Sequence, residues 1–204
     1  FTLTAGVDNI VGTAGNDTII GDNTQTGNAG PGDQIDGGAG VDWAAYEDAT
    51  AAVKVSLALT GWQATGGAGS DKLTGIENLY GSAFNDTLIG NAGVNYLSGG
   101  AGDDEYWINA SSDVVTEAAG QGIDTVKIGY VNSGTYTLTA NVENAEVLVS
   151  DTLAISVTGN VLDNVLIGHA GANVLSGLAG NDSLAGLAGH DTLDGGVGND
   201  LLAG

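Results

Sequence analysis

Aspartate or asparagine recurs every nine residues in the last quarter of the chain, always at the same distance from a glycine. Residues 159–203 divide into five consecutive blocks of nine: GNVLDNVLI, GHAGANVLS, GLAGNDSLA, GLAGHDTLD and GGVGNDLLA. In every block the first place is glycine, the sixth is aspartate or asparagine, and the eighth is leucine. Glycine lets the backbone turn sharply and leaves its carbonyls uncovered, while an aspartate adds a carboxylate to the edge of the turn. The blocks therefore predict turns that offer oxygen ligands to a cation.

The available ligand atoms indicate which cation this is. The chain has no cysteine and only two histidines. His169 and His190 stand at the second and fifth places of their blocks, so they do not share a metal geometry, and we expect both to be exposed turn residues. Oxygen ligands alone suit a hard cation with flexible coordination, which favours Ca²⁺ over Zn²⁺ or copper. We expect several such ions.

The strict period also predicts the elements that position these turns. A short repeat of this kind is typical of a solenoid, in which each block is a turn followed by a short strand that buries its apolar residue by stacking on its neighbours. Leucine or isoleucine at the eighth place would form the inward ladder. Further blocks occupy residues 3–20, 28–45, 66–74 and 81–107, and a six-residue unit lies at residues 75–80.

These blocks resemble the GGxGxDxUx nonapeptide of the repeats-in-toxin (RTX) family. The resemblance implies an all-β fold, a right-handed parallel β-roll or β-solenoid with two nonapeptides per coil. It also implies that each Ca²⁺ is held between turns one coil apart. Asn164, Asp182 and Asp200 would then line one edge of the roll, and Asn173 and Asp191 the other.

The sixth-place rule gives the candidate metal ligands. In the second repeat group we expect Asp71, Asp86 and Asp104 to stack on a common edge. Asp124 ends a degenerate turn, GQGID. The full set of candidate ligands is Asp8, Asp17, Asp33, Asp42, Asp71, Asp86, Asn95, Asp104, Asp124, Asn164, Asn173, Asp182, Asp191 and Asp200.

Some positions depart from the pattern. An asparagine at the sixth place brings no charge, so sites that use two asparagines should be weak or empty. Leu178 and Leu187 replace the second glycine, which leaves the backbone angle of those two turns open. Asp113 and Glu117 offer a further ion site, but two acids in a polar stretch are interpreted first as a solvated face.

Composition narrows the class of partner. The 204 residues carry a net charge of −22, with three basic residues against twenty-five acidic ones. This balance argues against nucleic acid or an anionic membrane surface as partner, and it means that bound cations would stabilise the compact chain. No apolar run is long enough to insert into a membrane. A fold that needs Ca²⁺ in place of disulfides is expected to be secreted, in the extracellular space or at the cell surface.

The chain reads as one elongated β-solenoid over residues 1–204. Its repeat groups span residues 3–45, 66–107 and 159–203, with spacer coils at 46–65 and 108–158. Alternation at residues 53–59 predicts one long strand with a buried face, and shorter strand-like runs occur at 114–116, 125–128, 135–139, 145–149 and 153–157. The polar segment 21–27 is interpreted as a surface loop. The sequence is interpreted as a piece of a longer protein or a processed subunit.

The expected function is structural rather than enzymatic. The sequence has no nucleophile elbow and no supported Ser-His-Asp arrangement. Trp43, Trp62 and Trp107 are interpreted as core filling rather than as a carbohydrate-stacking face. The likeness to bacterial surface-layer or matrix RTX proteins implies one-step (type I) secretion of a chain that folds on meeting Ca²⁺. It implies a scaffold that assembles with other copies of itself, head to tail, and that contacts cell-surface polysaccharide. The alternative is a secretion and folding module of a larger RTX enzyme or adhesin.

Overall fold

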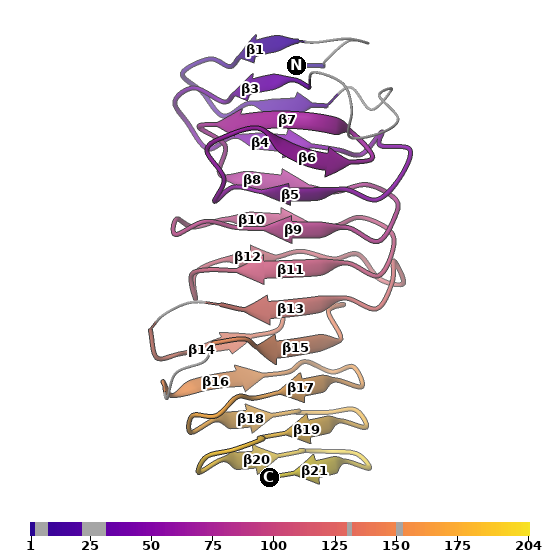
Figure 1. The fold of residues 1–204 in the computed structure, drawn as a ribbon. Coiled ribbons are helices and arrows are strands. Elements are labelled where there is room, and N and C mark those ends of the chain that lie inside the picture. The colour runs from indigo at the N-terminus through magenta and orange to yellow at the C-terminus, as the bar shows by residue number, and fades with distance from the viewer. Residues whose placement is uncertain (3–7, 22–31, 130–131, 150–152) are drawn as a thin grey trace.

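The chain forms a stack of flat coils that runs from its first strand to its last, as Figure 1 shows. The computed structural model describes residues 1–2, 8–21, 32–129, 132–149 and 153–204. All regular structure in these ranges is β-strand. The described residues contain no helix that is long and apolar enough to cross a membrane. The strands are β1 (Asn9–Val11), β2 (Thr18–Ile20), β3 (Gln34–Asp36), β4 (Trp43–Ala45), β5 (Lys54–Ser56), β6 (Gln63–Gly66), β7 (Gly69–Thr74), β8 (Asn78–Tyr80), β9 (Thr87–Ile89), β10 (Tyr96–Ser98), β11 (Glu105–Ile108), β12 (Val114–Val115), β13 (Thr125–Ile128), β14 (Gly134–Thr137), β15 (Asn144–Val147), β16 (Ile155–Thr158), β17 (Val165–Ile167), β18 (Val174–Ser176), β19 (Ser183–Ala185), β20 (Thr192–Asp194) and β21 (Leu201–Ala203).

Successive strands alternate between the two sides of the roll. The odd-numbered strands from β9 to β21 belong to one sheet, which β5 extends. The even-numbered strands other than β6 form two others, β12-β10-β8-β4-β2 and β14-β16-β18-β20. All of these pairs are parallel, and in the last coils Leu166 pairs with Leu184 and Leu184 with Leu202, eighteen residues apart. The chain is therefore a parallel β-roll, as the nonapeptide period predicts.

The residues at the eighth place of the blocks form the core of the roll. Because side chains alternate across a strand, only the middle residue of each three-residue strand points inward. Leu88, Leu97, Leu166 and Leu175 are fully buried. Leu202, in the last coil, is 47% exposed because no further coil covers it in the described structure. Stacking supplies the burial, at roughly 25 cal/mol per Å² of apolar surface.

Residues 53–59 do not form the one long strand that alternation predicts. Val53 and Val55 are buried, but β5 ends at Ser56 and Leu59 is 51% exposed. The Gln63 side chain accepts a bond from the Ser56 amide at 2.7 Å and donates one to the Ser56 carbonyl at 3.0 Å. These bonds close a turn, after which β6 pairs antiparallel with β7. Alternation detects the buried residues but not the reversal, since the reversal depends on pairing with β7.

The spacer at 108–158 continues the roll. The five predicted strand-like runs correspond to β12, β13, β14, β15 and β16, with ends shifted by at most a few residues. Tyr106, Val126 and Ala145 continue the inward ladder between Leu88 and Leu166. Residues 3–7, most of the expected loop at 21–27 and the start of the block at 28–36 lie outside the described residues.

Candidate metal centres

The sixth-place side chains form ladders along the two edges of the roll. In each step, the backbone amide of one sixth-place residue donates to a side-chain oxygen of the sixth-place residue one coil further on. The Asp86 amide donates to Asp104 Oδ1 at 2.7 Å, and the Asp104 amide donates to Asp124 Oδ1 at 2.9 Å. The same bond joins Asp8 to Asp33, Asp33 to Asp71, Asp17 to Asp42, Asn164 to Asp182, Asp182 to Asp200, and Asn173 to Asp191. Each predicted ligand thus occupies an edge turn. In residues 159–203 the ligands are divided between the two edges as predicted.

Three further acids extend these ladders. The Asp42 amide donates to Glu77 Oε2, and the Asp124 amide donates to Glu143 Oε2, both at 2.8 Å. Asp113 accepts a bond from the Asn95 amide at 2.9 Å. Sequence reasoning missed Glu77 and Glu143 because neither stands six places after a block-opening glycine. The feature that marks Glu77 and Glu143 as ladder residues is that each stands directly before a strand.

The expected common stack of Asp71, Asp86 and Asp104 is wrong at its first step. Asp71 accepts its ladder bond from Asp33, whereas Asp86 accepts one from the Val53 amide at 2.7 Å. The physical reason is the reversal at residues 57–62. It places β5, and not β7, beside β9 in the sheet.

A glycine opens most of the blocks because the sixth-place side chain lies against the first place. A Cβ added at Gly99 would stand 1.9 Å from Asp104 Oδ2, and one at Gly177 would stand 2.1 Å from Asp182 Oδ2. A side chain at either position would push the acid away from its place. The glycine therefore makes room for the acid on the edge of the roll.

The second place of the block divides the turns into two kinds. In the first kind, which we call capped turns, the second-place amide donates to the sixth-place side chain. The Thr13 amide donates to Asp17 Oδ2 at 2.6 Å, and the Asn160 amide donates to Asn164 Oδ1 at 2.8 Å. The second-place residues of the capped turns are Thr13, Ser82, Asn91, Asn160 and His169. Both side-chain groups of such an acid or amide are occupied by the protein.

In the second kind, which we call open turns, the second-place residue has a positive φ. The residues are Gly38, Gly100, Leu178, Leu187 and Gly196, with φ from 71° to 101°. No amide of these five donates to its sixth-place acid within the described residues. Asp42 Oδ2, Asp104 Oδ2 and Asp182 Oδ2 are buried there without a hydrogen-bond partner. The open turns thus leave a carboxylate oxygen available to a cation.

The backbone angles of Leu178 and Leu187, which the sequence does not predict, are resolved in the structure. Their φ values are 77° and 71°, so both turns keep the glycine-like backbone despite the side chain. This left-handed conformation costs roughly 1–2 kcal/mol for a residue with a Cβ. Both side chains are exposed, and the turns remain of the open kind.

The three sixth-place asparagines have protein partners on both side-chain atoms. Each Oδ1 accepts the second-place amide of its own capped turn. Each Nδ2 donates to a backbone carbonyl of the preceding coil: Asn95 to Glu77 at 2.7 Å, Asn164 to Glu143 at 3.0 Å and Asn173 to Ile155 at 2.7 Å. The amide joins two coils by hydrogen bonds alone.

A second ladder runs along the fifth place, and the sequence analysis missed it. The Asp103 amide donates to Asn85 Oδ1 at 3.0 Å, and the Asn181 amide donates to Asp163 Oδ1 at 2.6 Å. Asn181 Oδ1 in turn accepts from the Asn199 amide at 3.1 Å. These side chains are exposed, so the ladder orders the outside of the turns. Its sequence signal is the recurrence of Asn or Asp at spacing 18.

Two predictions about polar side chains are wrong. His169 is buried rather than exposed, because its ring lies beside Asn173, with Nδ1 3.2 Å from Oδ1. Asp113 and Glu117 are also buried rather than solvated. Asp113 Oδ2 caps a short turn by accepting from two amides, those of Asn109 and Ala110. His190 is exposed, as expected.

The tryptophans do not fill the core. Trp62 is 55% exposed and Trp107 is 37% exposed, while Trp43 is half-buried. The side chains of Trp43 and Trp107 stand at outward places of β4 and β11, which belong to different sheets. They therefore do not form a common carbohydrate-stacking face either.

Burial and mutual repulsion perturb the edge acids. Burial, together with the nearby carboxylates of Asp86 and Asp124, raises the pKa of Asp104 to about 7. Burial also raises the pKa of Asp124 to about 6 and that of Glu117 to about 8. The ion pairs found in the described residues join Lys127 to Glu105 and Glu146, on the outer surface. Buried carboxylate oxygens without a hydrogen-bond donor or a basic partner fit a hard cation such as Ca²⁺.

Comparison with known proteins agrees with this geometry. The family model described as the RTX calcium-binding nonapeptide repeat matches four copies, at residues 3–24, 73–106, 158–193 and 167–202. A curated relative, the endo-1,3-1,4-beta-glycanase ExsH of Rhizobium meliloti (strain 1021), is 38% identical over 113 residues. Those residues are 55% of this chain and 21% of the relative, so the match spans about a fifth of that protein.

Proposed function

The chain is an RTX calcium-binding β-roll protein that binds several Ca²⁺ ions, and from this premise we propose that it serves as a calcium-dependent extracellular structural scaffold. In this role its activity is to fold and to stay folded where Ca²⁺ is abundant. The open turns hold the ions, and the capped turns carry the roll across positions that need none.

One observation carries the proposal: buried carboxylate oxygens stacked along the edges without a partner. Asp42 Oδ2, Asp104 Oδ2 and Asp182 Oδ2 lie in open turns. An unpaired buried carboxylate is strongly destabilising, and the net charge of −22 adds general repulsion. A bound divalent cation supplies positive charge and several ligand positions. Because the unfolded chain has no preformed site, the binding free energy is also folding free energy.

The test is a Ca²⁺ titration of the metal-free chain at pH 7.5, followed by far-ultraviolet circular dichroism and size-exclusion chromatography. We expect an expanded chain with little β signal in EGTA, and a cooperative gain of β signal with compaction as Ca²⁺ is added. Mg²⁺ at the same concentration serves as the control, since its strict octahedral geometry suits these turns poorly. A full β signal in excess EGTA contradicts the proposal.

Location outside the cell follows from the same dependence. A fold that requires Ca²⁺ is favoured where the ion is plentiful, and cytosolic Ca²⁺ is too scarce to fill sites of sensor-like or weaker affinity. The chain would leave the cell unfolded and fold on arrival. Fractionation of the native cells, with detection of the chain in the medium or on the surface, tests this; retention in the cytosol contradicts it.

Self-assembly is a further part of the proposal. Among the described residues no strand pairs with the outer edge of β21, and Leu201 and Leu202 are 69% and 47% exposed. Another copy stacked on this edge would pair its backbone groups and cover the leucines. Sedimentation velocity in Ca²⁺ tests the idea, with Leu202→Glu as the disrupting variant and Val161→Glu, at an exposed position of a capped turn, as its control. A chain that stays monomeric at high concentration contradicts head-to-tail assembly.

A second candidate function is a repeat module of a larger enzyme. The observation that favours it is the 38% identity to a stretch of a protein named as an endoglycanase. The decisive measurement is the mass of the protein isolated from its native source, together with an assay on mixed-linkage β-glucan. A product of the size of this chain without hydrolysis favours the scaffold, whereas a larger product with hydrolysis favours the module.

A further inference from the structure

The turn at residues 117–124 brings a third acid, Glu117, to the edge ladder. We propose that Asp104, Glu117 and Asp124 form a three-carboxylate Ca²⁺ site in which Glu117 is a ligand that the nonapeptide repeat does not supply. The inference rests on the proposed calcium dependence and deepens it. Glu117 and Asp124 lie outside the segments that match the repeat family, which end at residue 106 and resume at residue 158.

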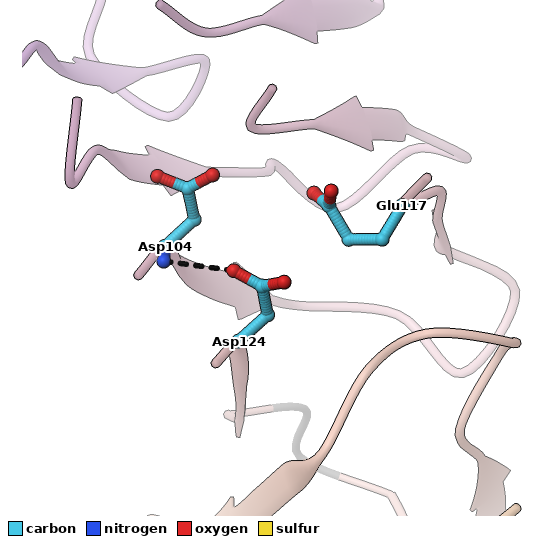
Figure 2. Close-up of side chains that lie close together, drawn as sticks. All are labelled: Asp104, Glu117 and Asp124. Carbon is cyan, nitrogen blue, oxygen red and sulfur yellow. Dashed lines mark hydrogen bonds between the residues drawn. The ribbon is translucent and has the colours of Figure 1, made fainter. Parts of the chain in front are cut away.

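The three carboxyl groups are close enough to share one ion. One oxygen from each residue lies within 4.8 Å of the others. Two oxygens that bind the same Ca²⁺ at 2.3–2.6 Å are at most about 5 Å apart, so this spacing fits. Figure 2 shows Asp104 and Asp124 side by side on the ladder, with the Glu117 side chain reaching toward them from a separate segment.

The site is buried and contains unsatisfied oxygens. Asp104, Glu117 and Asp124 are 2%, 8% and 1% exposed. Among the described residues, Asp104 Oδ2 and Glu117 Oε2 have no hydrogen-bond partner. The described ion pairs do not involve any of the three acids. Three acids in such a place require either protons or a cation.

The protein fixes one oxygen of each carboxylate and so orients the group. Asp104 Oδ1 and Asp124 Oδ1 accept ladder amides at 2.7 and 2.9 Å. Glu117 Oε1 accepts from the Tyr106 hydroxyl and from the Gly99 amide, the latter at 3.1 Å. These bonds orient the carboxylates once the roll has formed, so the side chains have less conformational freedom to lose when the ion binds.

The chain makes room for Glu117 by lengthening the turn. Val114 and Val115 pair with Tyr96 and Leu97, so Glu117 follows its strand at the place that Gly99 takes in the neighbouring coil. The turn at residues 99–104 has six residues, whereas the one at 117–124 has eight. The two extra residues relieve the contact that elsewhere requires glycine at the start of the turn. A side chain can therefore enter the site.

A third carboxylate gives this site more negative charge than a pair of sixth-place aspartates has. Ligand charge count is one of the features that set Ca²⁺ affinity. We therefore expect this site to bind more tightly than the other open turns and to fill first.

The test is isothermal titration of Ca²⁺ into the chain and into the Glu117→Gln variant, which keeps the shape of the side chain and removes its charge. Glu47→Gln is the matched control because Glu47 is exposed and the charge change is the same. We expect the variant to bind one ion fewer, or to bind its first ion about tenfold or more weakly, and the control to match the wild type. An unchanged ion number and first-ion affinity in Glu117→Gln would overturn the site.

A second measurement tests the site even if the Glu117→Gln variant does not fold. Tyr106 contacts Glu117, so Tb³⁺ bound in this site should emit when tyrosine is excited. We expect the first equivalent of Tb³⁺ to give an emission that falls by at least half in Tyr106→Phe and not in Tyr80→Phe. Equal emission from the two variants would overturn the site. If the wild type itself binds no Ca²⁺, the proposed function fails; if it binds Ca²⁺ but these changes have no effect, only this inference fails.

Discussion

Asn164 Nδ2 lies 3.0 Å from the backbone carbonyl of Glu143 in the preceding coil, and it donates a hydrogen bond there. Asn160 Oδ1 is 3.2 Å from the same nitrogen, and the Val142 carbonyl is 3.5 Å from it. The amide group thus stands among three oxygens, at the sixth place where other blocks carry an acid. The NH₂ group of Asn164 joins the two coils by hydrogen bonds. A cation at this place would join them by coordinating the same oxygens.

We predict that Asn164→Asp converts this turn into a cation site. The new carboxylate oxygen would face the Glu143 carbonyl and Asn160 Oδ1, so the variant should need more Ca²⁺ to fold and the Ca²⁺-loaded variant should hold one more ion. Ion counting by titration and the Ca²⁺ concentration at the midpoint of folding measure the two effects. Asn181→Asp, at an exposed fifth place, controls for the added charge. An unchanged ion count in Asn164→Asp contradicts the role assigned to this asparagine.

Capped turns should lose stability without losing an ion. Ser82 Oγ donates to Asp86 Oδ1 at 2.8 Å and accepts from the Phe84 amide at 3.2 Å. We expect Ser82→Ala to lower the free energy of unfolding by about 1 kcal/mol in saturating Ca²⁺, with the ion number unchanged. Chemical denaturation measures the loss, and Ser98→Ala, on the outer surface of β10, is the control. A lost ion in Ser82→Ala would mean that this turn holds a cation after all.

The core ladder predicts a contrast between two leucines in the last coils. Leu175 is fully buried, whereas Leu202 is 47% exposed. Leu175→Ala should cost about 2–5 kcal/mol of unfolding free energy in Ca²⁺, because it removes buried surface and leaves a cavity. Leu202→Ala should cost less than about 1 kcal/mol in the monomeric chain. Equal losses for the two variants would contradict the difference in burial between the two leucines.

The metal-free chain should be more stable in acid. Burial raises the folded-state pKa values of Asp124, Asp104 and Glu117 to about 6, 7 and 8, whereas the unfolded values are near 4. Between these values the folded state binds more protons than the unfolded state does, so stability is fully present below about pH 4 and is lost as pH rises through 6 to 8. Circular dichroism in EGTA from pH 4 to 8.5 measures this. Stability that rises with pH in EGTA would contradict the burial of these acids.

Strict periodicity explains what the sequence predicts well. The eighth-place ladder and the edge position of every sixth-place residue follow from a repeat in which each block needs its neighbour. Where the period breaks, local reasoning fails: the antiparallel pairing of β6 with β7 and the separation of Asp71 from Asp86 depend on contacts far apart in sequence. Burial of Glu117 was missed for the same reason, since its carboxylate contacts Gly99 and Tyr106 of the neighbouring coil.

The distinction between open and capped turns was present in the sequence but not recognised. Glycine or leucine stands at the second place of every open turn, and threonine, serine, asparagine or histidine stands at the second place of every capped one. The sixth place alone does not separate the two kinds, because Asp86 lies in a capped turn and Asp104 in an open one. The deciding feature is where the second-place amide points.

A crystal structure of the chain grown in excess Ca²⁺, with an anomalous difference map, tests the central claim most directly. The account predicts calcium peaks beside Asp42, Asp104 and Asp182, whose Oδ2 atoms are buried without a partner, and no peak between Asn95 and Asp113, which are satisfied by backbone groups. A fully ordered roll with no cation beside those three aspartates would contradict it.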